Sequence, residues 1–432
     1  MSFIPDIEQK SSGEIKEFQE QKLRELLQYL NTHSPYYKNL FNKLLINPGQ
    51  INSMEDLQKL PVTTKDDIQK NNWEFLCIEK SEVAEYTTTS GTLGSPVTIA
   101  LSHKDLERLA YNEYISFCCA DGSQHDCYQL MLTLDRQFMA GIAYYEGIRK
   151  LGASVIRVGP GLPQLQLESI LRLNPTILVA VPSFLLKLIE YARSENIDLN
   201  QTSVKSAVCI GESIRSPELG LSILARKILE DWNLRLYNTY ASTEMQTAFT
   251  ECSSGTGGHL HPELLIVELL DDNNIPVEKG SPGEITITTL GVEAMPLLRY
   301  KTGDISVAYY DPCLCGRNTL RLGPVIGRKQ EMIKLKGTTI YPPGIYNIMS
   351  EVDFVRDYAV EVISNEVGTD ELRIHIDVDS SNNNEFELKL KSIFKSRLRV
   401  VPEIVVTSQA KLLEMHFRGN SRKVKRFLDN RK

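Results

Sequence analysis

The feature that most constrains the fold is an alternation of apolar runs and helical stretches between residues 128 and 230. The apolar runs have the length of a strand, and helical stretches separate them. They are residues 130–134, 154–158, 176–181 and 206–210. This alternation is typical of parallel βα units, so the middle of the chain is predicted to be an α/β domain.

The pattern is different on both sides of this region. Ser11 and Glu14 have capping-box spacing and start a helix that ends at His33-Ser-Pro-Tyr-Tyr37; Ser102 and Asp105 cap another helix. Residues 264–270 and 283–290 flank a polar turn and predict an antiparallel hairpin. From about residue 331 the pattern restarts as strand, helix, two strands, helix and strand, which predicts a second, smaller domain.

Composition excludes several classes of protein. The 432 residues favour more than one domain, and a net charge of −7 argues against a nucleic-acid binder. Residues 1–6 lack a basic flank followed by an apolar core, and no apolar run is long enough to span a membrane. We therefore expect a cytoplasmic protein, in which the eight cysteines are thiols or metal ligands rather than disulfides.

A loop rich in glycine and hydroxyl groups runs from Tyr86 to Pro96. Glycine lets a backbone approach an anion closely, and Ser and Thr hydroxyls donate hydrogen bonds to phosphate oxygens. The loop lacks the Walker pattern. From these residues alone, a phosphate-binding loop and an ordinary polar turn are equally good interpretations.

Four segments, taken together, resemble adenylate-forming enzymes. They are Thr89-Ser-Gly-Thr-Leu-Gly-Ser-Pro96, Tyr240-Ala-Ser-Thr-Glu244, Arg299-Tyr-Lys-Thr-Gly-Asp304 and the Gly-Arg segment that starts at Gly327. Within that superfamily the chain looks most like phenylacetate–coenzyme A ligases. The segments that fit this family are His33-Ser-Pro-Tyr-Tyr37, Leu60-Pro-Val-Thr-Thr-Lys65, Glu293-Ala-Met-Pro-Leu297 and Cys313-Leu-Cys-Gly-Arg317.

The resemblance implies a fold and a reaction. Residues 1–327 would form an AMP-binding domain with βα sheets and an antiparallel part, and residues 328–432 a mobile ferredoxin-like lid with its hinge near Gln330. ATP would activate an aryl or related carboxylic acid as an acyl-adenylate, and coenzyme A would take the acyl group. The resemblance also implies a homodimer.

The resemblance assigns a role to each site residue. The phosphate loop would use Ser90, Gly91, Thr92 and Gly94, although Leu93 and Ser95 depart from the family pattern. The remaining nucleotide, acyl-pocket and thiol-tunnel residues would be Gly211, Glu212, Tyr240, Ala241, Thr243, Asp304, Arg328 and Gly337.

Two further residues would act in the reaction through their charged side chains. Glu244 would hold Mg²⁺, because a hard cation prefers oxygen ligands, and Lys423 would contact the carboxylate and α-phosphate oxygens. The plainer interpretations are a core aromatic at Tyr240, a solvated acid at Glu244, a strand-to-loop turn at Gly211 and a solvated basic tail at Lys423. The acyl pocket departs from the family at Met139 and its neighbours, so the sequence does not identify the acid.

Three thiols and one imidazole form a candidate zinc site. They are Cys252, His259, Cys313 and Cys315, and relatives often carry this set. Four protein ligands would make the site structural. His261 is the competing imidazole, and ordinary loop thiols are the alternative. The other cysteines are predicted to be core thiols: Cys77, Cys118, Cys119, Cys127 and Cys209.

Two other functions stay open. One is an adenylate-forming enzyme that passes the acyl group to a carrier protein, or AMP to another acceptor. The other is a non-catalytic nucleotide-binding relative, motivated by Leu93, Ser95 and Gln330.

Overall fold

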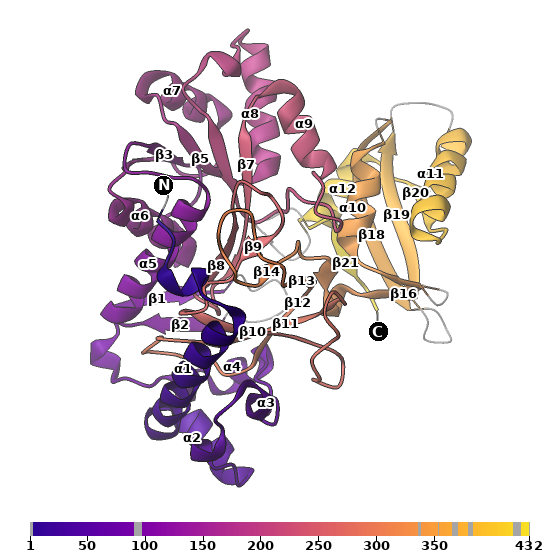
Figure 1. The fold of residues 1–432 in the computed structure, drawn as a ribbon. Coiled ribbons are helices and arrows are strands. Elements are labelled where there is room, and N and C mark those ends of the chain that lie inside the picture. Colours follow the sequence, from indigo (N-terminus) through magenta and orange to yellow (C-terminus); the bar gives the residue numbers. More distant parts are fainter. Residues whose placement is uncertain are drawn as a thin grey trace. The chain divides into compact units, whose positions relative to one another are not determined.

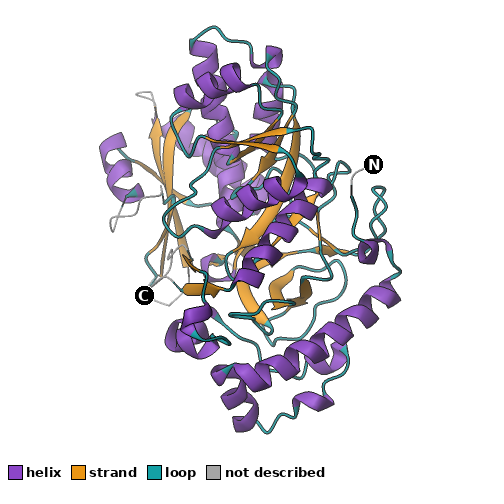
Figure 2. Cartoon of the chain, turned by 90° about the vertical axis from the view of Figure 1, so that its left-hand side faces the viewer, coloured by secondary structure: helices purple, strands orange, loops and turns teal. Residues whose placement is uncertain are grey.

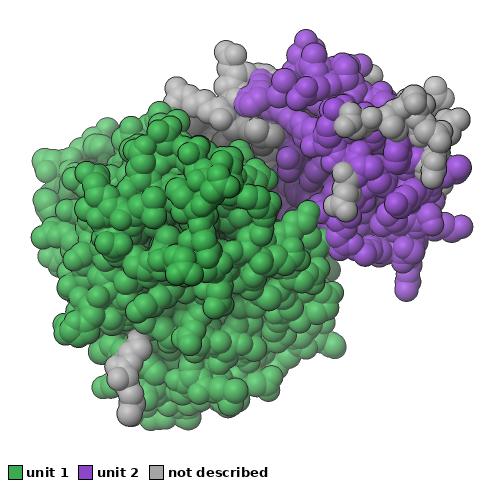
Figure 3. Space-filling view, turned by 90° about the horizontal axis from the view of Figure 1, so that it is seen from above, with its two compact units in different colours: residues 1–302, 306–324 green, residues 303–305, 325–432 purple. Residues whose placement is uncertain are grey.

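A computed structural model describes residues 3–89, 97–335, 338–352, 354–364, 370–378, 383–417 and 425–431. The chain forms two compact units, coloured separately in Figure 3. The large unit contains residues 1–302 and 306–324, and the small unit contains residues 303–305 and 325–432. Among the described residues, no helix combines the length and the apolar character that crossing a membrane would need.

The large unit is built on a nine-stranded sheet of order β13-β14-β9-β8-β7-β6-β5-β3-β4. Its parallel part confirms the predicted βα units. The parallel strands are β3 (Cys127–Leu130), β4 (Ser154–Arg157), β5 (Ile177–Ala180), β6 (Ser206–Cys209) and β7 (Arg235–Ser242).

The first of these strands begins earlier than predicted. The sequence predicted residues 130–134, whereas β3 is Cys127–Leu130. Gln129 lies in this strand and is fully buried, because its side-chain amide donates to the backbone oxygen and the side-chain oxygen of Gln166 at 3.2 and 2.9 Å. A buried polar residue whose side-chain amide group donates hydrogen bonds interrupts the apolar pattern without interrupting the strand.

Helices cover both faces of the parallel strands (Figures 1 and 2). Ile177 and Val179 pack on the face of α5 (His103–Cys119) and α6 (Met139–Leu151). Leu178 and Ala180 pack on the opposite face, in the same core as the three remaining helices. These are α7 (Pro163–Leu173), α8 (Pro182–Ser194) and α9 (Ile223–Asp231). Because successive strand residues point to opposite faces, a strand buried on both faces is apolar throughout.

The rest of the large unit is antiparallel or helical. The predicted hairpin is confirmed as β10 (Leu265–Leu270) and β11 (Gly283–Thr289). The other strands are β1 (Glu85–Thr88), β2 (Thr98–Leu101), β8 (Thr247–Glu251), β9 (Gly258–His259), β13 (Ala308–Tyr309) and β14 (Arg321–Leu322), while β12 (Tyr300–Ser306) contributes residues to both units.

The N-terminal part of the large unit contains four α-helices. Ser11 and Glu14 form the predicted capping box of α1 (Ser12–His33), and Ser102 and Asp105 form that of α5. Ser34 ends α1, and its side chain then caps α2 (Pro35–Lys43). The two shorter helices are α3 (Met54–Leu57) and α4 (Lys65–Asn71).

The small unit has its own apolar core and a four-stranded sheet of order β20-β19-β18-β21. It contains the predicted succession of strand, helix, two strands, helix and strand, followed by one more helix and strand. Its elements are β15 (Gly327–Arg328), β16 (Ile333–Leu335), β17 (Thr338–Ile340), α10 (Pro342–Ser350), β18 (Val355–Ser364), β19 (Asp370–Val378), α11 (Asn383–Leu398), β20 (Glu403–Val406), α12 (Gln409–His416) and β21 (Phe427–Asp429).

Candidate functional site

The predicted nucleotide residues of the large unit follow two neighbouring parallel strands. Gly211 and Glu212 come just after β6, and Tyr240 and Ala241 lie near the end of β7. Because Cys209 pairs with Asn238, these segments leave the sheet at the same edge. The carboxyl ends of parallel strands are where open α/β sheets bind ligands. We call Gly211, Glu212 and residues 240–244 the strand-end site.

The residues after β6 have defined local roles. Gly211 has a φ of 74°, a left-handed conformation that favours glycine. Glu212 accepts hydrogen bonds from the backbone nitrogen and the hydroxyl of Ser183, both at 2.9 Å, at the start of α8. The Glu212 carboxylate therefore has a structural job at this helix start besides its predicted place in the site.

The residues at the end of β7 are partly accessible to solvent. Tyr240 is half-buried, and its ring centroid lies 6.1 Å from that of Phe249 on β8. Ala241 is exposed, and Thr243 and Glu244 are half-buried in the turn that follows. The side chains of this segment are thus accessible enough to meet a ligand.

A buried arginine fixes the end of that turn. Arg108 donates to the backbone oxygen of Gln246 at 2.8 Å, to the hydroxyl of Thr247 at 3.1 Å and to the backbone oxygen of Leu264 at 2.7 Å. Burial lowers the pKa of Arg108 to about 10, which leaves it charged at neutral pH. A spacing pattern could not have found this anchor, because its acceptors are mostly backbone oxygens far away in the sequence.

Glu244 itself accepts a hydrogen bond from Tyr300. The Tyr300 hydroxyl lies 3.3 Å from Oε1 of Glu244. Tyr300 is only 2% exposed, so its hydroxyl is held in one place. The sequence analysis placed both residues in motifs but did not pair them.

In the small unit, Asp304 and Arg328 form one pair. They are opposite each other in β12 and β15, and Arg328 Nε donates to Asp304 Oδ1 at 3.1 Å. The Arg328 side chain is 46% exposed and that of Asp304 11%. A Cβ atom at Gly327 would lie 2.4 Å from the Tyr341 ring, so a glycine is needed directly before Arg328.

Six predicted site residues lie outside the described residues. They are Ser90, Gly91, Thr92, Gly94, Gly337 and Lys423. Their roles stay predictions.

The four predicted zinc ligands lie together. One ligand atom from each of Cys252, His259, Cys313 and Cys315 falls within 4.8 Å of the other three. The sulfur atoms of Cys252 and Cys313 are 3.6 Å apart, and Cys315 Sγ is 3.5 Å from His259 Nε2. Tetrahedral zinc, with bonds of about 2.3 Å to sulfur and 2.0 Å to nitrogen, sets these separations at about 3.8 and 3.5 Å. We call these four residues the cysteine–histidine cluster.

The surroundings favour metal ligation. His259 Nδ1 lies 3.1 Å from the Thr319 hydroxyl, which leaves Nε2 as the ligand atom. Burial raises the pKa of Cys313, but hydrogen bonds with His259, with the backbone of Cys315 and with Ser254 together outweigh burial and lower the pKa to about 7. Arg317 Nη1 lies 3.6 Å from Cys315 Sγ and stabilises a thiolate there.

The competing imidazole, His261, has a different partner. Its Nδ1 lies 2.5 Å from Oε1 of the fully buried Glu8, whose Oε2 accepts from Arg317 Nε at 2.6 Å. Burial raises the pKa of Glu8, but these two partners outweigh it and hold the pKa below its usual value. Cys119, predicted as a core thiol, is buried in contact with the cysteines of the cluster.

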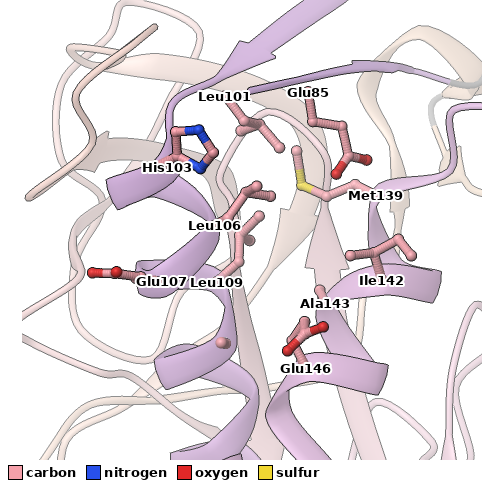
Figure 4. A pocket seen from close by; sticks show the side chains of 11 residues that line it. Glu85, Leu101, His103, Leu106, Glu107, Leu109, Met139, Ile142, Ala143 and Glu146 are labelled. Atoms are coloured by element: carbon pink, nitrogen blue, oxygen red, sulfur yellow. The ribbon is translucent and has the colours of Figure 1, made fainter. Parts of the chain in front are cut away.

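A separate cavity of about 290 Å³ lies between α5 and α6 (Figure 4). It includes Met139 and Ala143 but none of the predicted nucleotide residues. Its lining also includes Glu85 and Glu146, and burial raises the pKa of Glu85. Carboxylates at the edge of an apolar cavity disfavour an anionic acid, so we do not assign the acyl group to it.

Comparisons with known proteins find similarity to AMP-binding enzymes and ligases along most of the chain. The profile of the AMP-binding enzyme family matches residues 41–294, more than half of the chain. The chain is 27% identical over 388 residues to phenylacetate-coenzyme A ligase of Thermus thermophilus, covering 88% of this chain and 84% of that protein. It is 24% identical over 393 residues to the Aromatoleum evansii protein of the same name, covering 88% and 85%.

The fold is that of a solved ligase. A crystal structure of 2-hydroxyisobutyryl-CoA ligase in the postadenylation state, in complex with 2-HIB-AMP, superposes with a TM-score of 0.84 at 20% identity. The superposition covers 99% of this chain and 94% of that one.

Proposed function

Because the chain belongs to the AMP-binding enzyme family, we propose that it is an ATP-dependent acid–thiol ligase. A carboxylate oxygen attacks the α-phosphorus of ATP, and pyrophosphate leaves. The thiol sulfur of coenzyme A then attacks the acyl carbon, and AMP leaves. The observation that carries this proposal is the match to phenylacetate–coenzyme A ligases over 88% of the chain.

The described residues suit the first of these steps. A free carboxylate is a poor electrophile, and the reaction has to bring two anions together and neutralise charge that develops on phosphate. Glu244 supplies an oxygen ligand for Mg²⁺, which neutralises phosphate charge when bound. Tyr240 and Ala241 would hold the adenine, Thr243 the α-phosphate, and Asp304 the ribose hydroxyls, next to Arg328.

A structural Zn²⁺ fits the cysteine–histidine cluster. Its ligand separations agree with tetrahedral geometry, and four protein ligands leave no open position for substrate. We therefore assign this metal to folding rather than to catalysis.

Two assays test the reaction. Labelled pyrophosphate should exchange into ATP only when an accepted carboxylate is present, and a library of aryl and short-chain acids will identify that acid. With coenzyme A, the same acid should give a thioester. If exchange occurs but coenzyme A gives no thioester, and a carrier protein does give one, then the acyl acceptor is a carrier protein. No exchange with any acid, despite ATP binding, would favour the non-catalytic relative.

A homodimer stays a prediction.

Lys423 separates the two half-reactions. Lys423→Ala should slow formation of the acyl-adenylate on the order of 10²–10³-fold, because a preorganised charge at the phosphate is lost. Conversion of a supplied acyl-adenylate to thioester should be nearly unchanged. Lys425→Ala, in the same basic segment, is the matched control, and equal effects of the two variants would contradict the assignment.

A further inference from the structure

Two motifs of the N-terminal part were not explained by the reaction. They are His33-Ser-Pro-Tyr-Tyr37 and Leu60-Pro-Val-Thr-Thr-Lys65. In the structure both reach the same short segment, residues 298–301, which contains Tyr300. Their contacts indicate what the motifs do.

Thr63 clamps the backbone on both sides of Tyr300. Its backbone nitrogen donates to the oxygen of Arg299, and its backbone oxygen accepts from the nitrogen of Lys301, both at 2.9 Å. Its hydroxyl donates to the backbone oxygen of Leu298 at 2.8 Å. Three hydrogen bonds from one buried residue leave this backbone little freedom.

Tyr37 completes the clamp. Its hydroxyl accepts from the backbone nitrogen of Leu298 at 2.9 Å and lies 3.1 Å from the hydroxyl of Thr63. Tyr37 is fully buried, and Thr63 is 1% exposed. The two motifs therefore meet in one buried hydrogen-bond network.

Arg299, next to Tyr300, is in a strained conformation. Its φ is 46°, in the left-handed region that non-glycine residues rarely adopt. The Arg299 guanidinium is buried and forms an ion pair with Glu268 at 2.9 Å, and it also donates to the backbone oxygens of Gln58 and Leu60. Such strain persists only where the surroundings hold it in place, and it occurs often at functional sites.

We propose that Tyr300 is a positioning residue for Glu244 in metal-dependent adenylation, which rests on the proposed function. Its hydroxyl donates to Oε1 of Glu244 and thereby restricts the carboxylate, which would leave Oε2 to hold the cation of the nucleotide. Tyr37 and Thr63 hold the backbone that carries the hydroxyl. Neither motif needs to touch substrate.

The test compares Tyr300→Phe with wild type over a series of Mg²⁺ concentrations in the pyrophosphate exchange assay. A hydrogen bond to a charged carboxylate corresponds to a change between about tenfold and 150-fold. We expect the half-saturating Mg²⁺ concentration to rise by that factor, while the rate at saturating Mg²⁺ stays near that of wild type. A second measurement, binding of Mn²⁺ in the presence of ATP followed by electron paramagnetic resonance, should weaken by the same factor.

Tyr237→Phe is the matched control. Tyr237 also donates to a carboxylate, that of Asp121 at 2.8 Å, and it lies on β7, the strand that carries Tyr240. This variant should leave both metal curves unchanged. In a Glu244→Gln background, Tyr300→Phe should have no further effect on either curve, because the carboxylate that it positions is gone.

An unchanged metal dependence in Tyr300→Phe, an equal shift in Tyr237→Phe, or full additivity with Glu244→Gln would overturn the inference. If Tyr300→Phe does not fold, Thr63→Val serves instead, with a smaller shift in the same direction expected and an unchanged curve counting against the inference. Failure of the proposed function is distinguishable, since wild type would then bind Mn²⁺ with ATP but show no exchange.

Discussion

The strand-end site and the cysteine–histidine cluster are both polar regions of the large unit, but they are built in opposite ways. In the cluster, the ligand atoms face one another and three of the four residues are buried. In the strand-end site, Ala241 and Glu212 are exposed and Glu244 is half-buried. The ligand atoms of the closed region face one another, whereas the side chains of the open one are accessible to solvent.

Two buried carboxyl groups, Glu8 near the cluster and Glu113 near the strand-end site, differ in their partners and in the direction of their pKa shifts. Glu8, beside the cluster, is fully buried with Arg317 and His261 as partners, and its pKa lies below the usual value. Glu113 is on α5, the helix that anchors the turn after Glu244, and its carboxyl group accepts a hydrogen bond from the neutral side chain of Asn112 at 3.0 Å. Burial raises the pKa of Glu113 to about 8. Of these two carboxyl groups, Glu8 is thus compensated by a cation, whereas Glu113 lies against a neutral amide.

The largest expected effect tests the closed region. Cys313→Ser should remove bound zinc and lower the melting temperature by roughly 10 °C or more, because structural zinc contributes folding free energy directly. Elemental analysis and thermal denaturation measure the two changes. Cys127→Ser, at a half-buried thiol outside the cluster, should change neither. A Cys313→Ser protein of native stability would mean that the cluster holds no structural metal.

The next effect tests the open region. Glu244→Gln keeps the side-chain shape but loses a charged Mg²⁺ ligand, so exchange should fall on the order of 10²-fold. The melting temperature should stay within about 2 °C, since the residue is half-buried and its loss leaves no buried charge without a partner. Glu85→Gln, also half-buried, is the control. A large loss of stability with little loss of exchange would reverse the comparison.

The smallest effect concerns Glu113 and pH. The folded protein keeps a proton on this group up to about pH 8, whereas the unfolded chain loses it near the ordinary value of 4.5. The folded state therefore binds more protons in that window, and the free energy of unfolding should fall as pH rises through it, by up to about 1.4 kcal/mol per pH unit.

Glu113→Gln should flatten this decline, because a neutral amide has no proton to lose. Urea denaturation at pH 5, 6, 7 and 8 measures the slope. Glu107→Gln, at an exposed position of the same helix, should leave the slope as in wild type. Equal slopes in Glu113→Gln and wild type would show that Glu113 is charged throughout.

The sequence predicted those parts of the fold in which local pattern and burial agree. The run at residues 176–181 became Ile177–Ala180, because a strand covered on both faces has to be apolar throughout. The prediction of β3 was wrong in position, because Gln129 is buried against Gln166 and no hydropathy pattern can anticipate that partner.

The same limit applies to the sites. Cysteine and histidine types at short spacings suggested the cluster, and the structure brings those four residues together. The supports were not predicted: Arg108 binds backbone oxygens, and Tyr300 meets Glu244 across 56 residues of sequence. A hydrogen bond between distant residues leaves no periodic signal, so the side chains that hold the site in place were found only in three dimensions.

The pairing of Glu8 with Arg317 has a consequence for how the protein is made. The two residues are 309 positions apart, and the backbone oxygen of Glu8 also accepts from the nitrogen of Asn318. At about 5–20 residues per second, a ribosome needs roughly 15–60 s to synthesise that interval. Glu8 is therefore synthesised well before Arg317, the cation that it pairs with. In the same way, Thr63 is synthesised well before Arg299 and Lys301. The nascent N-terminal helices are therefore synthesised long before the segments that they contact in the folded protein, such as Pro262 and Leu265, which bind Gln19 of α1.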